Sequence, residues 1–337
     1  MLAPALRRPP AVGRVIERVT ATARRYRMFD PGSRVVIAVS GGPDSVCLLH
    51  SMVRLARLLR IDPVCFHFDH GLRKGSEDDA AYVRGQARRL GVPFVLRRAT
   101  TRPARGDSVE AWARTVRYQA LTNVLEELGG GVAAVGHTAD DQAETVLLAL
   151  LRGGGLEAIS GMKPVSGPLV RPLLETTRQE TEAFCKSLRL RPRRDPMNED
   201  PAFMRVGVRT RVIPHLERAL GRSLRSTLVR TAELLRQDAE FLDQLASTAR
   251  SEVVARSGPG VTLLRAGPLE ALAPSIAGRI VRRALLDFGA LPEAGHVEAV
   301  IGLSTARPGR SVTLPGGLLA RREREYVRLV RPSLRPA

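Results

Sequence analysis

The chain has 337 residues, of which 44% are hydrophobic, and it carries a formal net charge of +19. This length allows two domains with apolar cores, and the basic excess indicates a polyanionic partner such as nucleic acid rather than a membrane surface. The three cysteines are isolated, the first 14 residues lack the apolar core of a signal peptide, and no apolar run is long enough to cross a bilayer. We therefore expect a cytoplasmic protein without a cysteine-based metal site.

Strand and helix signals alternate over the first half of the chain. Apolar runs bounded by turn residues predict strands at 35–39, 63–68, 93–96, 132–135 and near 169–174. Apolar residues at helical spacing predict helices at 46–60, 77–90, 109–128 and 178–188. This alternation predicts an α/β fold with a parallel sheet covered by helices on both faces. In such sheets ligands bind at the carboxyl ends of the strands.

The pattern changes beyond residue 214. Leucines at helical spacing between 224 and 245 predict one long helix. A glycine- and proline-containing break at 257–260 follows, and then a strand at 261–264, a helix at about 275–288 and a hairpin signal at Gly316 and Gly317. We expect a nucleotide-binding domain over 1–215, a helical connector over 216–256 and a small, basic α+β domain over 257–337.

The segment between the first predicted strand and helix carries the most chemical information. It consists of Ser40, Gly41, Gly42, Pro43, Asp44 and Ser45. Backbone N–H groups and a helix N-terminus meet there and can bind an anion, and the two glycines let phosphate oxygens approach closely. The segment lacks the lysine of a Walker loop. By itself it is also compatible with an ordinary strand-to-helix turn.

Charged side chains follow two other predicted strands. His70 and Arg73 follow the second strand, and His137 follows the fourth. Thr138 can cap the next helix with Asp141 as its partner, but this cap does not explain Asp140 and Glu144. Asp141 and Glu144 share one helical face, where a carboxylate pair can hold Mg²⁺ or a substrate ammonium group.

Two basic clusters can contact phosphate or nucleic acid. Arg114 and Arg117 lie on one helical face with Tyr118, where they can bind phosphate or stack on a base; a solvated basic face is the alternative. Arg194 belongs to an arginine-rich segment that is followed by Arg205 and Arg209, near the expected domain junction.

These segments occur together in an order that resembles the tRNA(Ile)-lysidine synthetase family of N-type ATP pyrophosphatases, which carry a PP-loop. The resemblance covers 34–215 densely and the remainder loosely. It implies a Rossmann-like ATP pyrophosphatase domain in a bacterial enzyme. Such an enzyme uses ATP to adenylylate C2 of the wobble cytidine of isoleucine tRNA with a CAU anticodon. L-lysine then displaces AMP, which forms lysidine and switches decoding to AUA.

The resemblance also implies a role for each matching residue. Ser40 to Ser45 hold the ATP phosphates, Asp44 and Asp140 are candidate Mg²⁺ ligands, and Asp141 and Glu144 receive the lysine. The residues implied to be catalytic or to contact the nucleotide are His70, Arg73, Arg114, Arg117 and His137. The residues implied to contact tRNA are Arg194, Arg205 and Arg209. The expected partners are the tRNA, L-lysine and ATP, and a homodimer is allowed.

The chain departs from the family pattern at two positions, and two other functions stay open. Thr138 stands where a second histidine is frequent, and Val206 stands where asparagine is frequent. A PP-loop tRNA thiolase would need cysteine pairs, which the three isolated cysteines do not provide. A non-catalytic ATP-binding sensor would need neither the basic charge nor the acidic helix at 140–144.

Overall fold

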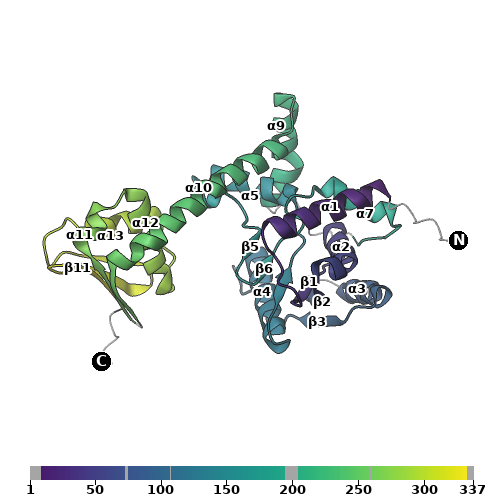
Figure 1. Ribbon diagram of the computed structural model, residues 1–337, viewed down its shortest axis with the longest axis horizontal. Helices are drawn as coiled ribbons and strands as arrows, with labels where there is room; N and C mark the ends of the chain where they lie inside the picture. The colour runs from purple at the N-terminus through teal and green to yellow at the C-terminus, as the bar shows by residue number, and fades with distance from the viewer. Residues whose placement is uncertain (1–8, 73–74, 107, 194–203, 259, 332–337) are drawn as a thin grey trace. The chain divides into compact units, whose positions relative to one another are not determined.

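The computed structural model describes residues 9–72, 75–106, 108–193, 204–258 and 260–331 (Figure 1). The chain divides into two compact units, Met1–Glu233 and Leu234–Ala337, and the division falls inside one long helix. The boundaries expected at residues 215 and 256 stay predictions. Within the described part of the chain, no helix combines the length and the apolar character that crossing a membrane requires.

The first unit contains a six-stranded sheet in the order β3-β2-β1-β4-β6-β5. The strands are β1 (Arg34–Ala38), β2 (Asp62–Asp69), β3 (Phe94–Arg98), β4 (Val132–Ala134), β5 (Val165–Ser166) and β6 (Leu169–Val170). All pairings are parallel except the edge pairing of β5 with β6, which confirms the predicted α/β class.

The order of the strands reverses at β1, and this reversal marks the part of the carboxyl edge where a ligand is expected. The chain adds β2 and β3 on one side of β1 and then returns to place β4 on the other side of β1. Such a reversal separates the loops that leave the two central strands, and ligands of open α/β sheets bind there. The segment from Ser40 to Ser45 leaves β1 at this reversal.

Helices cover both faces of the sheet, as predicted. On one face Val35 and Ile37 of β1 pack with α1 (Pro10–Arg25), α2 (Pro43–Leu59), α3 (Ser76–Leu90) and α7 (Arg178–Ser187). On the opposite face Val36 packs with Leu121 of α4 (Val109–Glu127). Helix α1, which the sequence analysis did not predict, buries Val12, Val15, Ile16 and Val19 at helical spacing.

The remaining helices of the first unit are α5 (Ala139–Leu151), α6 (Leu156–Ile159), α8 (Met204–Gly207) and α9 (Ile213–Leu220). A π-helical turn, η2 (Val208–Val212), joins α8 to α9, and such turns are frequent at functional sites. Leu148 of α5 packs against Val208 and Ile213 and holds this turn against α5.

The long helix α10 (Leu224–Val253) contains the leucines whose spacing predicted it and lies within the expected helical connector. It leads into the second unit, a five-stranded antiparallel sheet in the order β7-β8-β11-β10-β9 with α11 (Ala266–Ala271), α12 (Pro274–Asp287) and α13 (Ala294–Gly302). The strands are β7 (Val254–Gly258), β8 (Val261–Arg265), β9 (Ser311–Leu314), β10 (Leu318–Arg322) and β11 (Tyr326–Val330). The predicted α+β module is confirmed, although β7 and β11 were not predicted.

The three glycines before β4 provide a test of the pairing between β1 and β4. Gly131 has φ +117°, and a Cβ there would lie 2.4 Å from the carbonyl oxygen of Arg34 on β1. We expect Gly131→Ala to destabilise the protein by about 2–4 kcal/mol, because a strained backbone and a steric overlap coincide. Gly129→Ala is the control, since φ is +79° but nothing lies within 4 Å. Equal losses of Tm in the two variants would contradict the steric argument.

Candidate active site

The loop between β1 and α2 is organised by the hydroxyl of Ser45. Ser45 Oγ accepts hydrogen bonds from the backbone N–H of Ser40 at 3.1 Å and of Gly41 at 3.2 Å, and it donates to the Gly42 carbonyl at 2.9 Å. Gly41 has φ +98°, a conformation that favours glycine. Helix α2 begins at Pro43, so the N–H groups of its first turn have no partner within the helix and can bind an anion.

Gly136 brings the end of β4 against this loop. A Cβ at residue 136 would lie 3.3 Å from the backbone nitrogen of Ser45, which is tighter than an ordinary contact. The glycine therefore allows the residues that follow β4 to approach the start of α2.

A cleft of about 490 Å³ opens at this point. Thirteen of the predicted site residues line it: Ser40, Gly42, Pro43, Asp44, Ser45, His70, Arg114, Arg117, His137, Asp141, Glu144, Arg205 and Arg209. Gly41 and Asp140 do not line the cleft. Arg73 and Arg194 lie outside the described residues.

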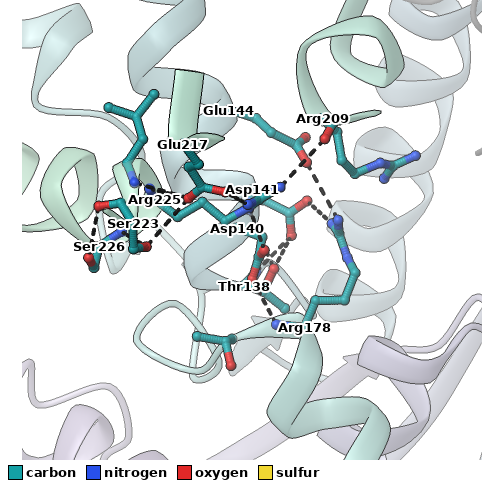
Figure 2. Close-up of polar contacts among 12 residues, drawn as sticks. Thr138, Asp140, Asp141, Glu144, Arg178, Arg209, Glu217, Ser223, Arg225 and Ser226 are labelled. Carbon is teal, nitrogen blue, oxygen red and sulfur yellow. Dashed lines mark hydrogen bonds and ion pairs between the residues drawn. The ribbon is translucent and has the colours of Figure 1, made fainter. Parts of the chain in front are cut away.

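Three of the predicted carboxylates converge on Arg178, a residue that the sequence analysis did not single out. Figure 2 shows two of them, Asp141 and Glu144, beside Arg178. Its Nη2 lies 2.9 Å from Asp141 Oδ1, its Nη1 lies 3.5 Å from Glu144 Oε1, and its Nε lies 3.5 Å from Asp44 Oδ2. Arg178 is the first residue of α7, which starts at the end of the sheet where the cleft opens. Thr177 and Glu180 form a capping box at the start of α7, and this cap fixes the position of Arg178.

Two of the three carboxylates have further partners. Asp141 Oδ2 accepts from the N–H and the hydroxyl of Thr138, both at 2.8 Å, so the predicted cap of α5 is confirmed. Asp44 Oδ1 accepts a short hydrogen bond from the Thr181 hydroxyl. Among the described residues, Glu144 Oε1 has no hydrogen-bond partner, and the Glu144 residue is only 3% exposed.

Burial changes the proton affinity of these groups. Burial raises the pKa of Asp44 to about 6, although the Thr181 hydrogen bond and the charge of Arg178 oppose the rise. Burial and the charge of Asp141 raise the pKa of Glu144 to about 7, against the opposing charges of Arg178 and Arg209. Burial works against the charge of Arg178, but the carboxylates outweigh it and raise its pKa.

Asp140 points to a different set of partners from its neighbour Asp141. Its Oδ2 accepts from the backbone N–H of Arg178 at 2.8 Å, and its Oδ1 lies 3.2 Å from Arg225 Nε. Arg225 also forms a short ion pair with Glu217. Asp140 thus links α5 to the starts of α7 and α10. Among the described residues, no group of three His, Cys, Asp or Glu side chains is arranged to hold a metal ion.

Basic and aromatic side chains form the cleft wall on α4 and β2. The guanidinium groups of Arg114 and Arg117 lie 4.8 Å and 5.5 Å from the ring centroid of Tyr118. Burial lowers the pKa of Arg117. The rings of His70 and Trp112 lie 6.1 Å apart, and His70 also meets Phe68 edge to face at 4.8 Å. His70, Arg114 and Arg117 line the cleft and can contact phosphate groups and planar bases, whereas the Trp112 and Tyr118 rings do not line it.

His137 is held as a neutral imidazole. Arg171 Nε donates to His137 Nδ1 at 3.2 Å, and the residue Arg171 is itself buried. Burial lowers the pKa of His137 to about 3, and the charge of Asp141 only partly offsets this. His137 can therefore accept or donate a hydrogen bond at neutral pH, but it does not carry a charge there.

Arg205 on α8 and Arg209 on η2 close the cleft beside α5. Arg205 Nη2 donates to Thr145 Oγ1 at 3.2 Å, and Thr145 Oγ1 donates to the Asp141 carbonyl at 2.8 Å. Two predicted arginines thus reach the same end of α5 as the acidic side chains.

The cleft, the loop and the strand order define the first unit as a PP-loop domain. A family model described as a PP-loop domain matches residues 14–216, and one described as a TilS substrate binding domain matches residues 264–328. The "tRNA(Ile)-lysidine synthase" of Salinispora tropica is 42% identical over 86% of this chain and 88% of its own. That of Salinispora arenicola is 38% identical over 96% of this chain and 97% of its own. The chain belongs to the tRNA(Ile)-lysidine synthase family.

A solved structure shares the fold. The U34-tRNA thiolase NcsA from Methanococcus maripaludis, described with its [4Fe-4S] cluster, superposes with a TM-score of 0.57 at 16% identity over 67% of this chain and 80% of its own. In the present chain all three cysteines, Cys47, Cys65 and Cys185, are free and buried. Burial raises their pKa values, to about 12 for Cys65 and Cys185. The thiolase alternative is therefore less supported.

The raised pKa of Glu144 predicts a pH-dependent effect on stability. The unfolded carboxyl ionises near pH 4.5 and the folded one near pH 7, so the wild type loses stability as pH rises between these values. Glutamine cannot ionise. We expect Glu144→Gln to be more stabilising, relative to wild type, at pH 8 than at pH 5 by about 2 kcal/mol, measured by urea unfolding.

Glu127→Gln is the matched control, since this side chain is 55% exposed and forms a surface ion pair with Arg97. Its effect should vary little with pH. A Glu144→Gln effect that is the same at both pH values would contradict the burial argument.

Proposed function

We propose that this chain is a tRNA(Ile)-lysidine synthase. It uses ATP to adenylylate C2 of the wobble cytidine of isoleucine tRNA with a CAU anticodon, and L-lysine then displaces AMP. The observation that carries the proposal is the convergence, in one cleft, of a phosphate-binding loop with buried carboxylates suited to an ammonium group. The relatives at 38–42% identity support it by their names.

The loop from Ser40 to Ser45 is suited to the ATP phosphates. It offers the first-turn N–H groups of α2 and the positive end of the helix dipole. The Asp44 carboxylate lines the cleft beside the loop, where it would hold an Mg²⁺ ion. Such an ion would neutralise phosphate charge as the cytidine oxygen attacks the α-phosphate and pyrophosphate leaves. Asp140 does not line the cleft, so its position does not support the expectation that it is an Mg²⁺ ligand.

Glu144 and Asp141 are suited to receive the lysine. An ammonium group must lose a proton before its nitrogen can attack C2, and a carboxylate with a pKa of about 7 accepts that proton effectively near neutral pH. As the C2–N bond forms, the bond from C2 to the oxygen of AMP breaks. His137, Arg114 and Arg117 lie in the same cleft and can hold the nucleotide or AMP.

Basic side chains in both units are suited to the tRNA. In the first unit Arg205 and Arg209 line the cleft. In the second unit a groove of about 270 Å³ is lined by Arg265, Arg322 and Arg324 together with an aromatic ring. We also propose that the protein acts in the cytoplasm. The expected homodimer remains a prediction.

Mass spectrometry of isoleucine tRNA after incubation with enzyme, ATP and lysine tests the proposal. We expect the wobble cytidine to gain the mass of lysine less water, only when both ATP and lysine are present. A sulfur mass gain would favour the thiolase alternative. ATP binding without AMP, pyrophosphate or modified tRNA would favour the sensor.

Removal of the Ser45 hydroxyl tests the loop. We expect Ser45→Ala to slow tRNA-dependent pyrophosphate release by about 100-fold, because the hydroxyl holds two loop N–H groups and the loop must be positioned for the phosphates. Ser51→Ala on the same helix is the control, since this buried hydroxyl donates to the Leu48 carbonyl and does not line the cleft. Similar rates for Ser45→Ala and wild type would rule out this role.

Salt dependence tests the groove of the second unit. Arg324 is exposed and lines the groove, whereas Arg283, with a 72% exposed side chain, pairs with Asp287 in the same unit outside it. We expect Arg324→Ala to reduce the slope of log K for tRNA against log salt by about 0.7–0.9, and Arg283→Ala to leave it unchanged. Equal slopes for wild type and Arg324→Ala would remove the groove from the tRNA contact.

A further inference from the structure

The guanidinium of Arg178 approaches the acidic side chains from behind the cleft. Asp44, Asp141 and Glu144 all line the cleft, but Arg178, which contacts all three, does not. The Arg178 side chain is 22% exposed, and its backbone N–H is tied to Asp140 at the start of α7. Arg178 therefore does not occupy the space that a substrate would fill.

The three carboxylates differ in how many of their oxygens are engaged. Both oxygens of Asp141 have partners, Arg178 on one and Thr138 on the other. Both oxygens of Asp44 also have partners, Arg178 on one and Thr181 on the other. Glu144 is the exception. Its buried Oε1 has no hydrogen bond from any residue that the structure describes, and Arg178 approaches it as an ion pair at 3.5 Å.

A buried carboxylate oxygen without a hydrogen bond is costly unless a ligand satisfies it. Glu144 lines the cleft, so a ligand in the cleft can supply the missing donor. An ammonium group has three donors and a positive charge, which matches this need.

We propose that Arg178 is a positioning residue for the amine substrate, which holds Asp44 and Asp141 in place and leaves Glu144 as the carboxylate that accepts the ammonium group. The proposal rests on the proposed function for the identity of the amine as lysine. Arg178 itself touches neither lysine nor the reacting atoms.

The negative charges of the three carboxylates explain why a cationic positioning residue is needed. Three carboxylates so close together repel one another, and without an internal cation they would turn apart or bind solvent cations. Arginine suits the position because its planar fork reaches several carboxylates at once, whereas lysine presents a single point charge. Arg205 donates instead to Thr145 Oγ1 on α5, and the charges of Arg205 and Arg209 act on Glu144.

Steady-state kinetics of Arg178→Met and Arg178→Lys test the proposal, with the KM values for lysine and ATP measured separately. We expect Arg178→Met to raise the lysine KM about 10-fold or more and the ATP KM less than about 3-fold. Arg178→Lys should recover part of the loss, because it restores the charge but not the fork.

Arg18→Met is the matched control. Arg18 forms an ion pair with Glu180 on the same helix, α7, and lies outside the cleft lining. It should change neither KM, and thermal unfolding of each variant confirms that the protein is folded. If Arg178→Met does not fold, the same KM ratio in Arg178→Lys decides the question.

Three outcomes would overturn the inference. An unchanged lysine KM would show that Arg178 has no effect on amine binding. Equal increases in both KM values would show that it supports the phosphate loop instead. A lower lysine KM would show that its guanidinium competes with the substrate. A wild-type enzyme that forms no lysidine would refute the proposed function, whereas lysidine formation with unchanged variant kinetics refutes only this inference.

Discussion

The close approach between the end of β4 and the first turn of α2 is the constraint on which the site depends. Gly136 permits backbone contact at a distance that a side chain would prevent. This contact brings α5, which begins three residues later, beside the loop that leaves β1. The carboxylates of α5 and the N–H groups of α2 therefore face one cleft, although they come from distant parts of the chain.

Placing carboxylates next to a phosphate site carries an electrostatic cost, and the chain offsets it with arginines. Arg178 neutralises part of the acidic cluster from within, while Arg225 does the same for Asp140 on the side away from the cleft. Positive and negative side chains therefore occupy separate parts of the same cleft. The cleft presents cationic side chains on α4 and η2 and acidic ones on α5, so anionic and cationic substrates can be bound side by side.

Patterns that are local in the chain were predictable. An apolar run, a glycine turn and a helical period identified β1, the loop and α2, and the spacing of Thr138 and Asp141 identified a real cap. Relations between distant segments were not predictable. Asp140 and Asp141 are neighbours in sequence, but adjacent residues of a helix point about 100° apart, so only Asp141 reaches the cleft.

Arg178 was missed for the same reason, because its carboxylate partners lie on other elements. The end of the last parallel strand and the cap at Thr177 were a usable signal, since they place the start of α7 at the ligand-binding edge of the sheet. Strand β7 was missed because its mixed composition carries little periodic signal, whereas β11 alternates buried and exposed residues, a signal that the sequence analysis did not use.

The burial of all three thiols has a practical consequence. Cys47, Cys65 and Cys185 are at most 2% exposed, and their raised pKa values keep them protonated at neutral pH. Since the thiolate is the form that reacts, we expect the three thiols of the folded protein to react slowly with maleimides and iodoacetamide. A cysteine introduced at an exposed position would then be the single reactive thiol. The natural sequence can thus accept a fluorophore or spin label without prior removal of its own cysteines.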